Sequence, residues 1–326
     1  MRHISILVPS GNSSLSNLEA TYKMFSMTNE AMIKAGKPAV FKLQLVATNE
    51  KARLSNGIFS IIPDTDIKSV DRTDLIIIPA IHGDYSKVIE NNREFVPWIL
   101  QQHNLGAEVA SLCIGAFLLA ETGLLDGMDC ATHWLAAEDF RSMFPKINLV
   151  SDRIITDENG IYTSGGAYSS LNLILYLIEK FAGRELAVLS SKIFQIDINR
   201  NSQSPFIIFH GQKSHNDVEI IKIQEYIESN YQDKLNVDDL CDRISLSRRT
   251  FERRFKKATS NTTIAYIQMV KVEAAKKQLE IGHKNVNEVM YDVGYSDAKA
   301  FRDVFRKITG MTPVDYQNHY KRAPVF

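Results

Sequence analysis

Short apolar runs alternate with longer helical stretches over the first part of the chain. The runs are rich in β-branched residues, as is typical of strands buried on both faces, and they span Ile4–Val8, Phe41–Ala47, Leu75–Ile78 and Ala107–Leu112. Apolar residues recur at helical spacing in Ser16–Ala35, Asn91–Gln102, Gly115–Thr122 and Tyr168–Phe181. Strands that alternate with helices predict a parallel sheet with helices on both faces. We therefore expect a doubly wound α/β domain, a flavodoxin-like sandwich, over residues 1–196.

The pattern changes after this domain. Residues 197–216 are polar and rich in turn-forming residues, with one apolar island at Phe206–Phe209. We interpret them as a linker whose apolar island docks on a domain surface. From Asp217 onward the apolar spacing is helical, beginning with Val218–Tyr231, and no strand alternation follows. Residues 217–326 are therefore predicted to form a separate all-α domain.

An internal repeat is the most informative feature of this second domain. Phe251–Tyr266 matches Phe301–Tyr316 at an offset of fifty residues, and just upstream Val237–Ile244 matches Val286–Val293. Each copy has the pattern of a short helix, a tight turn and a second helix. This spacing predicts two helix-turn-helix motifs, at about residues 236–258 and 286–308.

The residues around the two turns fit this interpretation. Ser247 in the first copy, and Ser296 or Asp297 in the second, occupy N-cap positions, where a side-chain oxygen accepts hydrogen bonds from unpaired backbone N–H groups. Gly294 supplies the unusual backbone conformation that the turn of the second copy requires.

Charge is segregated along a chain whose formal net charge is zero, with 38 basic and 38 acidic residues. This neutrality argues against a protein built to coat nucleic acid. The segment Ser247–Lys284, however, holds ten Lys or Arg residues and three Glu residues. A basic patch confined to one small domain is typical of a surface that binds phosphates.

Both second helices place Phe residues on one face and charged residues on the other. A solvated charged face is the simpler interpretation, but the duplication after a capped turn favours binding of double-stranded DNA, because an α-helix fits the major groove. We expect base contacts from the first turns of these helices, at Arg249, Glu252, Arg253, Lys299, Arg302 and Asp303. We expect phosphate contacts from Arg248, Arg254, Lys256, Lys257, Arg306 and Lys307.

These residues resemble the DNA-binding domain of the AraC/XylS family of transcription regulators, in which a long helix joins two such motifs. The resemblance covers about the last hundred residues, and Thr262–Ile281 fits the connecting helix. One departure is that Ser260-Asn-Thr-Thr lacks the Gly and Pro of Gly310-Met-Thr-Pro313. The resemblance implies a homodimer that contacts its partner copy through the first domain, and an activator that works with RNA polymerase.

A cysteine stands at a strand-to-helix junction of the first domain. Cys113 follows the predicted strand Ala107–Leu112, so the N–H groups of Ile114 and Gly115 lie at a helix N-terminus, a place that activates a thiol or binds a carboxylate. His133 and Trp134 follow twenty residues later. This stretch resembles the ThiJ/PfpI branch of the class I glutamine-amidotransferase-like superfamily, particularly members fused to AraC-type domains, and the likeness covers about residues 3–190.

The resemblance implies a ligand pocket lined by Asn17, His82, Cys113, Ile114, Gly115, His133 and Trp134. Plain packing also accounts for Cys113 and His133. A small side chain fits a tight elbow, and a histidine serves well at the start of a helix. Relatives of this architecture often respond to amino-acid derivatives or amines, which the resemblance implies as the class of small-molecule effector.

An enzyme of this superfamily needs a nucleophile, a base and usually an acidic partner. Cys113 and His133 match the first two, but the acidic position aligns with Asn17, and an amide cannot act as a general base. The loop Pro79–Gly83 also lacks the Gly-Gly expected of an oxyanion hole. We therefore expect no catalytic residue and a pocket retained as a sensor. Two alternatives are a cysteine-dependent hydrolase or deglycase tethered to DNA, and a redox sensor at Cys113.

The sequence indicates no other chemistry. Its three cysteines form no CxxC pair, and its histidines show no metal-ligand spacing, so neither a metal site nor a cofactor is predicted. No apolar run reaches the roughly 18 residues that span a bilayer, and the first residues form no signal peptide. We expect a cytoplasmic protein without a membrane partner.

Overall fold

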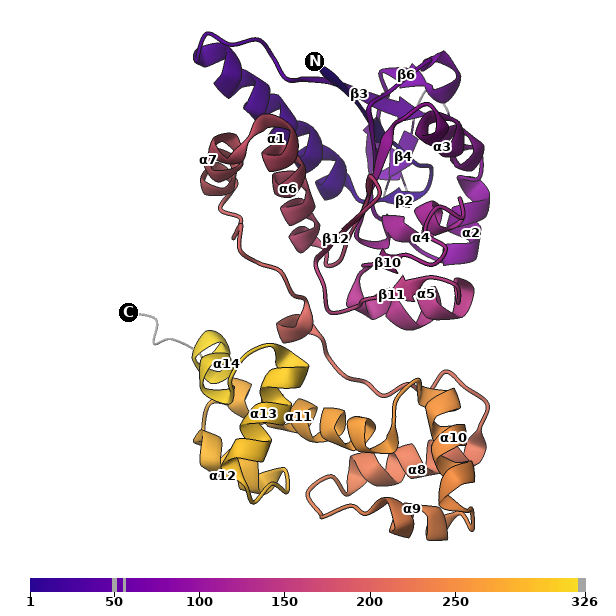
Figure 1. Ribbon diagram of the computed structural model, residues 1–326, viewed down its shortest axis with the longest axis vertical. Helices are drawn as coiled ribbons and strands as arrows, with labels where there is room; N and C mark the ends of the chain where they lie inside the picture. Colours follow the sequence, from indigo (N-terminus) through magenta and orange to yellow (C-terminus); the bar gives the residue numbers. More distant parts are fainter. Residues whose placement is uncertain (49–51, 55–56, 322–326) are drawn as a thin grey trace. The chain divides into compact units, whose positions relative to one another are not determined.

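The structure is a computed structural model that describes residues 1–48, 52–54 and 57–321 (Figure 1). The chain divides into two compact units, Met1–Gln203 and Ser204–Phe326. This boundary falls inside the segment 197–216 that the sequence predicts as a linker. Within the described ranges, every helix is too short or too polar to cross a membrane.

A seven-stranded sheet forms the middle of the first unit. Its strands are β1 (Arg2–Leu7), β3 (Phe41–Ala47), β6 (Thr65–Asp66), β7 (Leu75–Ile78), β9 (Glu108–Leu112), β12 (Ile155–Glu158) and β13 (Ile161–Ser164). They lie in the order β12-β13-β9-β7-β1-β3-β6, and every pair is parallel except β12–β13. The order from β3 to β13 is that of a flavodoxin-like, doubly wound sheet. The predicted fold class is therefore confirmed for this domain.

Three small two-stranded sheets accompany the central one. They pair β2 (Asn12–Ser13) with β8 (Ile81–His82), β4 (Ala52–Leu54) with β5 (Phe59–Ile61), and β10 (Asp129–Cys130) with β11 (Asn148–Leu149).

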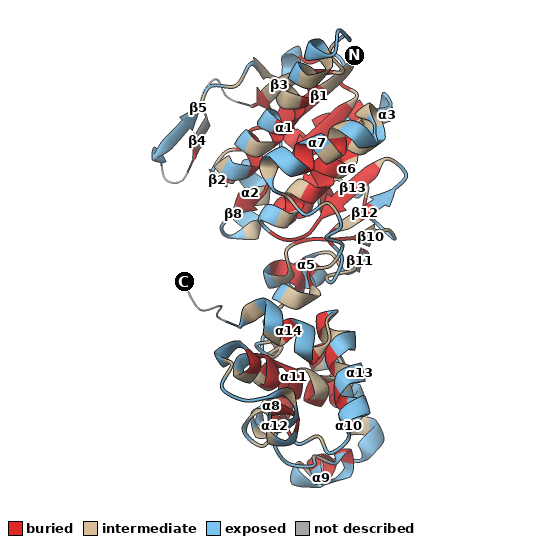
Figure 2. Cartoon of the chain, turned by 90° about the vertical axis from the view of Figure 1, so that its left-hand side faces the viewer, coloured by how far each residue is buried: buried red, intermediate tan, exposed pale blue. Residues whose placement is uncertain are grey.

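Helices cover both faces of the central sheet (Figure 1). One face carries α1 (Leu15–Lys34), α6 (Leu171–Ala182) and α7 (Arg184–Phe194), and the other carries α2 (Tyr85–Asn91), α3 (Phe95–Asn104), α4 (Ala116–Ala120) and α5 (Ala137–Met143). Successive side chains of a strand point to opposite faces, so Ile4 and Ile6 join one core while Leu7 joins the other. Figure 2 shows the strands and the inner helix faces as buried.

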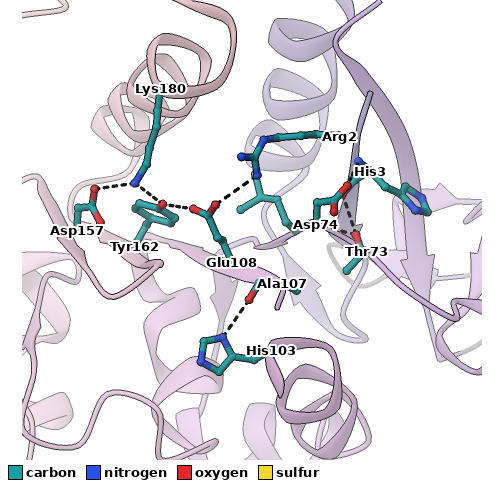
Figure 3. A network of polar contacts seen from close by, with 11 residues as sticks. Arg2, His3, Thr73, Asp74, His103, Ala107, Glu108, Asp157, Tyr162 and Lys180 are labelled. Atoms are coloured by element: carbon teal, nitrogen blue, oxygen red, sulfur yellow. Dashed lines mark hydrogen bonds and ion pairs between the residues drawn. The ribbon is translucent and has the colours of Figure 1, made fainter. Parts of the chain in front are cut away.

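A polar network ties the amino ends of three strands together (Figure 3). The Tyr162 hydroxyl donates to Glu108, and Lys180 Nζ donates to the Tyr162 hydroxyl at 2.6 Å. Arg2 pairs with Glu108 at 3.3 Å, and Lys180 pairs with Asp157 at 3.2 Å. The charges of this network balance one another, so it anchors one end of the sheet and leaves the carboxyl ends of the strands for other roles.

The second unit consists of helices. They are α8 (Val218–Ser229), α9 (Val237–Arg243), α10 (Arg248–Thr259), α11 (Thr263–Ile281), α12 (Val286–Asp292), α13 (Ala298–Thr309) and α14 (Pro313–Tyr320). Two apolar cores share α11: one packs it against α8–α10 and the other against α12–α14. The pairs α9–α10 and α12–α13 are the two helix-turn-helix motifs, and α11 is the helix that connects them.

The turns show the expected chemistry, with one substitution between the copies. Ser247 caps α10 by accepting from the Thr250 N–H, and Asp297, rather than Ser296, caps α13. Gly294 has a φ of +75°, and Ser245 holds the same left-handed conformation in the first turn at +50°. A serine therefore adopts, at a steric cost, the conformation for which the second copy uses glycine.

Candidate functional site

The first candidate site is the elbow at the carboxyl end of β9. Cys113 has a φ of +56° and begins the 3-10 turn Cys113–Gly115, so the chain bends sharply there, as the sequence predicts. A Cβ at Gly115 would lie 2.6 Å from the Pro79 carbonyl oxygen. Only glycine therefore allows the elbow to pass so close to the end of β7.

Asn17 lies in the first turn of α1 and is 4% exposed. Its Oδ1 accepts from the Ala80 N–H and its Nδ2 donates to the Ser170 hydroxyl, each at 3.2 Å. Both ends of the amide are thus engaged in joining α1 to the loop after β7 and to the start of α6. In this arrangement Asn17 positions the carboxyl edge of the sheet.

His133 is half-buried and caps the short 3-10 helix Trp134–Ala136. Its Nδ1 accepts from the Leu135 N–H at 3.1 Å, which requires a lone pair on Nδ1 and places the proton of the neutral ring on Nε2. Burial, and then the neighbouring His82, lower the pKa of His133. The imidazole is therefore neutral near pH 7 and offers one N–H donor at Nε2.

Sequence reasoning missed two residues that brace the elbow. Thr132 Oγ1 donates to the Cys113 carbonyl oxygen at 3.0 Å, and Gln203 Nε2 donates to the Thr132 carbonyl oxygen at 3.0 Å. The available signal was the Gly165-Gly166 pair after β13, because adjacent glycines mark a close approach of another group. A Cβ at Gly165 would lie 1.9 Å from Gln203 Nε2.

The second candidate site is the outer face of α10 and α13. Phe251 and Phe255 of α10 are buried, as are Phe301 and Phe305 of α13. Away from these Phe pairs, eleven of the twelve predicted DNA-contacting residues are exposed, and Arg254 alone among the twelve is half-buried. The exposed residues are Arg248, Arg249, Glu252, Arg253, Lys256, Lys257, Lys299, Arg302, Asp303, Arg306 and Lys307. The burial pattern of the two helices is nearly the same residue for residue, so the duplication in sequence is also a duplication of surface.

Two arginines of α10 are held by carboxylates. Arg248 lies between Asp238 and Glu252, at 3.2 Å from each. Arg254, predicted to contact phosphate, instead donates to both oxygens of Asp217, the N-cap of α8. The hydrogen bonds from Arg254 lower the pKa of Asp217. Because this bidentate pair joins two helices, Arg254 serves the packing of the domain.

Comparisons with known proteins cover both domains. A model described as "DJ-1/PfpI family" matches residues 5–180, more than half of the chain, and one described as "Helix-turn-helix domain" matches residues 240–319. The chain belongs to the DJ-1/PfpI family. Its second match places an AraC-type helix-turn-helix domain after the DJ-1/PfpI domain, which is the combination of an AraC-family transcription regulator and confirms the predicted arrangement.

Two curated relatives match this chain over most of its length. The HTH-type transcriptional regulator GbdR of Pseudomonas aeruginosa is 27% identical over 80% of this chain and 70% of its own length. The HTH-type transcriptional regulator ArgR of the same organism is 25% identical over 68% of this chain and 67% of its own. A crystal structure of a putative transcriptional regulator protein from Vibrio parahaemolyticus has a TM-score of 0.53 at 22% identity and covers 59% of this chain and 98% of its own, which shows a shared fold.

Within this DJ-1/PfpI domain the elbow cysteine is poorly set up as a nucleophile. Cys113 is 2% exposed, and burial raises the pKa of its thiol to about 12, although the Ile114 N–H that faces the sulfur lowers it. The thiolate is the reactive form of cysteine, and this thiol is protonated near pH 7. Among the described residues, no hydrogen bond joins His133 to Cys113.

Proposed function

We propose that this AraC-type protein binds specific double-stranded DNA as a homodimer and regulates transcription in response to a small molecule. The observation that carries the proposal is the duplicated surface. Two capped helices, α10 and α13, bury equivalent Phe pairs and expose cations at three equivalent positions, 249/299, 256/306 and 257/307. A helix of this kind fits the major groove, where Arg forms paired hydrogen bonds with guanine.

Arg249, Glu252, Arg253, Lys299, Arg302 and Asp303 read base edges in this proposal. Phosphates are held in this proposal by Arg248, Lys256, Lys257, Arg306 and Lys307. The family suggests that the bound protein activates transcription by contacting RNA polymerase, and a DNA target fits the proposed cytoplasmic location.

The effector site we propose lies at the carboxyl edge of the sheet, the edge where ligands bind in open α/β folds. It is lined by Asn17, His82, Cys113, Ile114, Gly115, His133 and Trp134. The neutral His133 Nε2–H suits a ligand carboxylate, and the Trp134 ring offers a face to an amine cation. These features support an amino-acid derivative or an amine as the effector.

We propose that this domain senses a ligand without transforming it. A hydrolase or deglycase needs a thiolate, a base in contact with it and an acidic partner. The raised pKa of Cys113 argues against a thiolate. Asn17 stands where the acidic partner is expected, and both ends of its amide are used in packing. The same buried, protonated thiol argues against redox sensing, which needs an accessible thiolate.

Replacement of Arg253 or Arg302 by Ala tests the DNA-binding proposal. Each change should weaken binding to a duplex selected by the parent protein by about 1–3 kcal/mol, because each removes base contacts from an exposed side chain. Fluorescence anisotropy titrations at fixed salt measure the effect. Lys222→Ala is the matched control, since Lys222 is an exposed cation on α8 that pairs with Glu219. Equal affinity of both Arg variants and the parent would contradict the proposal.

A further inference from the structure

The last residue of the first unit, Gln203, is a buried glutamine that fastens the end of this unit in place. Gln203 is 2% exposed, and its Nε2 donates to the carbonyl oxygens of Thr132, Ser151 and Arg153 at 3.0, 3.1 and 2.9 Å. Its backbone N–H donates to the Asp152 carbonyl oxygen at 2.7 Å. The side chain fills a cradle at Gly165, where a Cβ would collide with it.

This fastening is incomplete at one atom. An amide nitrogen has two hydrogens to share among the three carbonyl oxygens. The other end of the amide, Oε1, is buried without a hydrogen-bond partner among the described residues. A buried acceptor without a hydrogen-bond partner destabilises the folded state, because it has lost the hydrogen bonds that it makes with water when exposed. Hydrogen bonds from Nε2 therefore hold Gln203 in its buried position, but its release would let water hydrogen-bond to Oε1 and so recover part of the lost free energy.

Gln203 holds the segment that carries the candidate effector residues. It binds the carbonyl oxygen of Thr132, whose hydroxyl in turn binds the Cys113 carbonyl oxygen at 3.0 Å. His133 and Trp134 follow Thr132 directly in the chain. A ligand that shifts His133 or Trp134 therefore acts on the peptide group to which Gln203 is bonded.

A second fastening, within the second unit, follows a few residues later. Lys276 Nζ donates to the Ile207 carbonyl oxygen, and the Phe209 N–H donates to Glu273 Oε2 at 3.1 Å. Lys276 and Glu273 form an ion pair at 2.8 Å, with side chains 5% and 10% exposed. Both lie on α11, the helix that connects the two helix-turn-helix motifs.

Three residues separate Gln203 from Ile207, where the second fastening begins. Ser204, Pro205 and Phe206 form a 3-10 turn that is closed by a hydrogen bond from the Ile207 N–H to the Ser204 carbonyl oxygen. Pro205 has a fixed φ, and its carbonyl oxygen accepts from the Tyr320 hydroxyl at 3.3 Å. A folded turn of this length transmits a small displacement of Gln203 better than an extended coil would.

We propose that residues 203–209 form a coupling strap that links the loop at residues 131–134 to α11. A ligand that displaces the loop changes the docking of Gln203, and the strap passes this change to the helix that sets the two DNA-contacting helices relative to each other. The inference rests on the proposed function, because it assigns the route between its two sites. Coupling of this kind is reciprocal, so DNA binding must also change the loop.

Reciprocity allows a test without knowledge of the effector. The full chain is mixed with a duplex that the parent protein selects from a randomised library, and amide hydrogen exchange is measured at residues 131–135. DNA should change these exchange rates about five-fold or more in the parent. The change should shrink to less than about two-fold in Gln203→Ala, which undoes one fastening, and in Glu273→Leu/Lys276→Met, which removes both charges of the other fastening.

Asn199→Ala is the matched control, because Asn199 is an exposed neighbour outside the strap and should keep the parental response. Exchange in β1 and β9 verifies that each variant is folded, and the two fastenings give independent tests. If the parent selects no duplex, the proposed function is overturned and the strap with it. If the parent binds DNA but the loop does not respond, or both variants respond like the parent, the strap alone is overturned.

Discussion

At the scale of single residues, the elbow cysteine combines two unusual features. Cys113 is a non-glycine residue in the left-handed region, a conformation that costs roughly 1–2 kcal/mol, and its thiol is buried. Neighbours hold it in place: Ser164 accepts from its N–H at 3.4 Å, and Thr132 donates to its carbonyl oxygen. The backbone N–H and carbonyl groups of Cys113 are thus both hydrogen-bonded, and these bonds fix the conformation of the elbow.

The pKa of the buried thiols predicts how stability depends on pH. Burial raises the pKa of Cys113 and of Cys130 from 9.0 to about 12. The unfolded chain ionises these thiols above pH 9 while the folded chain keeps them protonated. The free energy of unfolding should therefore be full below pH 9 and fall as the pH rises toward 12. A catalytic or redox-active thiol has a lowered pKa and would show the opposite sign.

Urea unfolding followed by tryptophan fluorescence measures this effect in the first domain alone, since both tryptophans, Trp98 and Trp134, lie there. Cys113→Ala should make the decline between pH 9 and 11 shallower than in the parent. Cys241→Ala is the control, because Cys241 lies in the second unit and its loss should leave the tryptophan signal unchanged. A decline as steep in Cys113→Ala as in the parent would refute the assignment.

At the scale of elements, the two helix-turn-helix turns offer a matched comparison within one chain. Gly294 is required by sterics, because a Cβ there would lie 2.2 Å from the Gln232 carbonyl oxygen and 2.6 Å from Lys271 Nζ. Lys271 is itself committed, since it donates to the Val293 carbonyl oxygen at 2.9 Å. Gly294→Ala should therefore destabilise the second motif by about 2 kcal/mol or more.

The reverse change in the first motif should do the opposite. Ser245 holds a left-handed φ, so Ser245→Gly relieves strain and should stabilise the first motif by up to about 1 kcal/mol. Amide exchange in α9 and α12 of the intact chain measures each motif separately. Slower exchange in α9 for Ser245→Gly and faster exchange in α12 for Gly294→Ala are expected. The comparison would be contradicted if the two substitutions changed amide exchange in the same direction.

At the scale of the whole molecule, the boundary between the units has a direct consequence for isolated domains. The structure starts the second unit at Ser204, whereas apolar periodicity starts it at Asp217. Residues 204–216 contribute Phe209, whose ring packs edge-on against Tyr266 at 5.2 Å, and the contacts that cover the Lys276–Glu273 pair. These contacts are lost from a fragment that begins at Asp217.

A fragment of residues 204–326 should therefore melt at a higher temperature than a fragment of residues 217–326. For a domain of this size the difference should be about 4–8 °C for each kcal/mol of lost packing, as measured by circular dichroism. Both fragments should bind DNA more weakly than the full chain, because a monomer loses the avidity of two tethered domains. Identical melting temperatures would show that residues 204–216 are not part of the domain.

The sequence by itself determined the fold class and the two-domain plan. Phe41–Ala47 and Leu75–Ile78 are predicted with the bounds that the structure has. Leu75–Ile78 is a continuous apolar run, which suits a strand buried on both faces of a parallel sheet, and Phe41–Ala47 begins with the alternation of apolar and polar residues that is typical of a strand. The helix-turn-helix motifs followed from a repeat whose cap at Ser247 acts within a few residues. Features of this kind depend on local periodicity and local hydrogen bonds, which a single chain displays directly.

Tertiary structure alone decided the roles of several polar residues. The strand β13 (Ile161–Ser164) was missed because its Thr and Ser lack apolar character, yet all four residues are buried by neighbours on both faces. Asn17 acquired its role from Ala80 and Ser170, and Gln203 became a buried anchor through carbonyl groups 50 to 71 residues away. A polar side chain is buried when distant backbone groups satisfy it, and which groups those are depends on the packing of the whole domain.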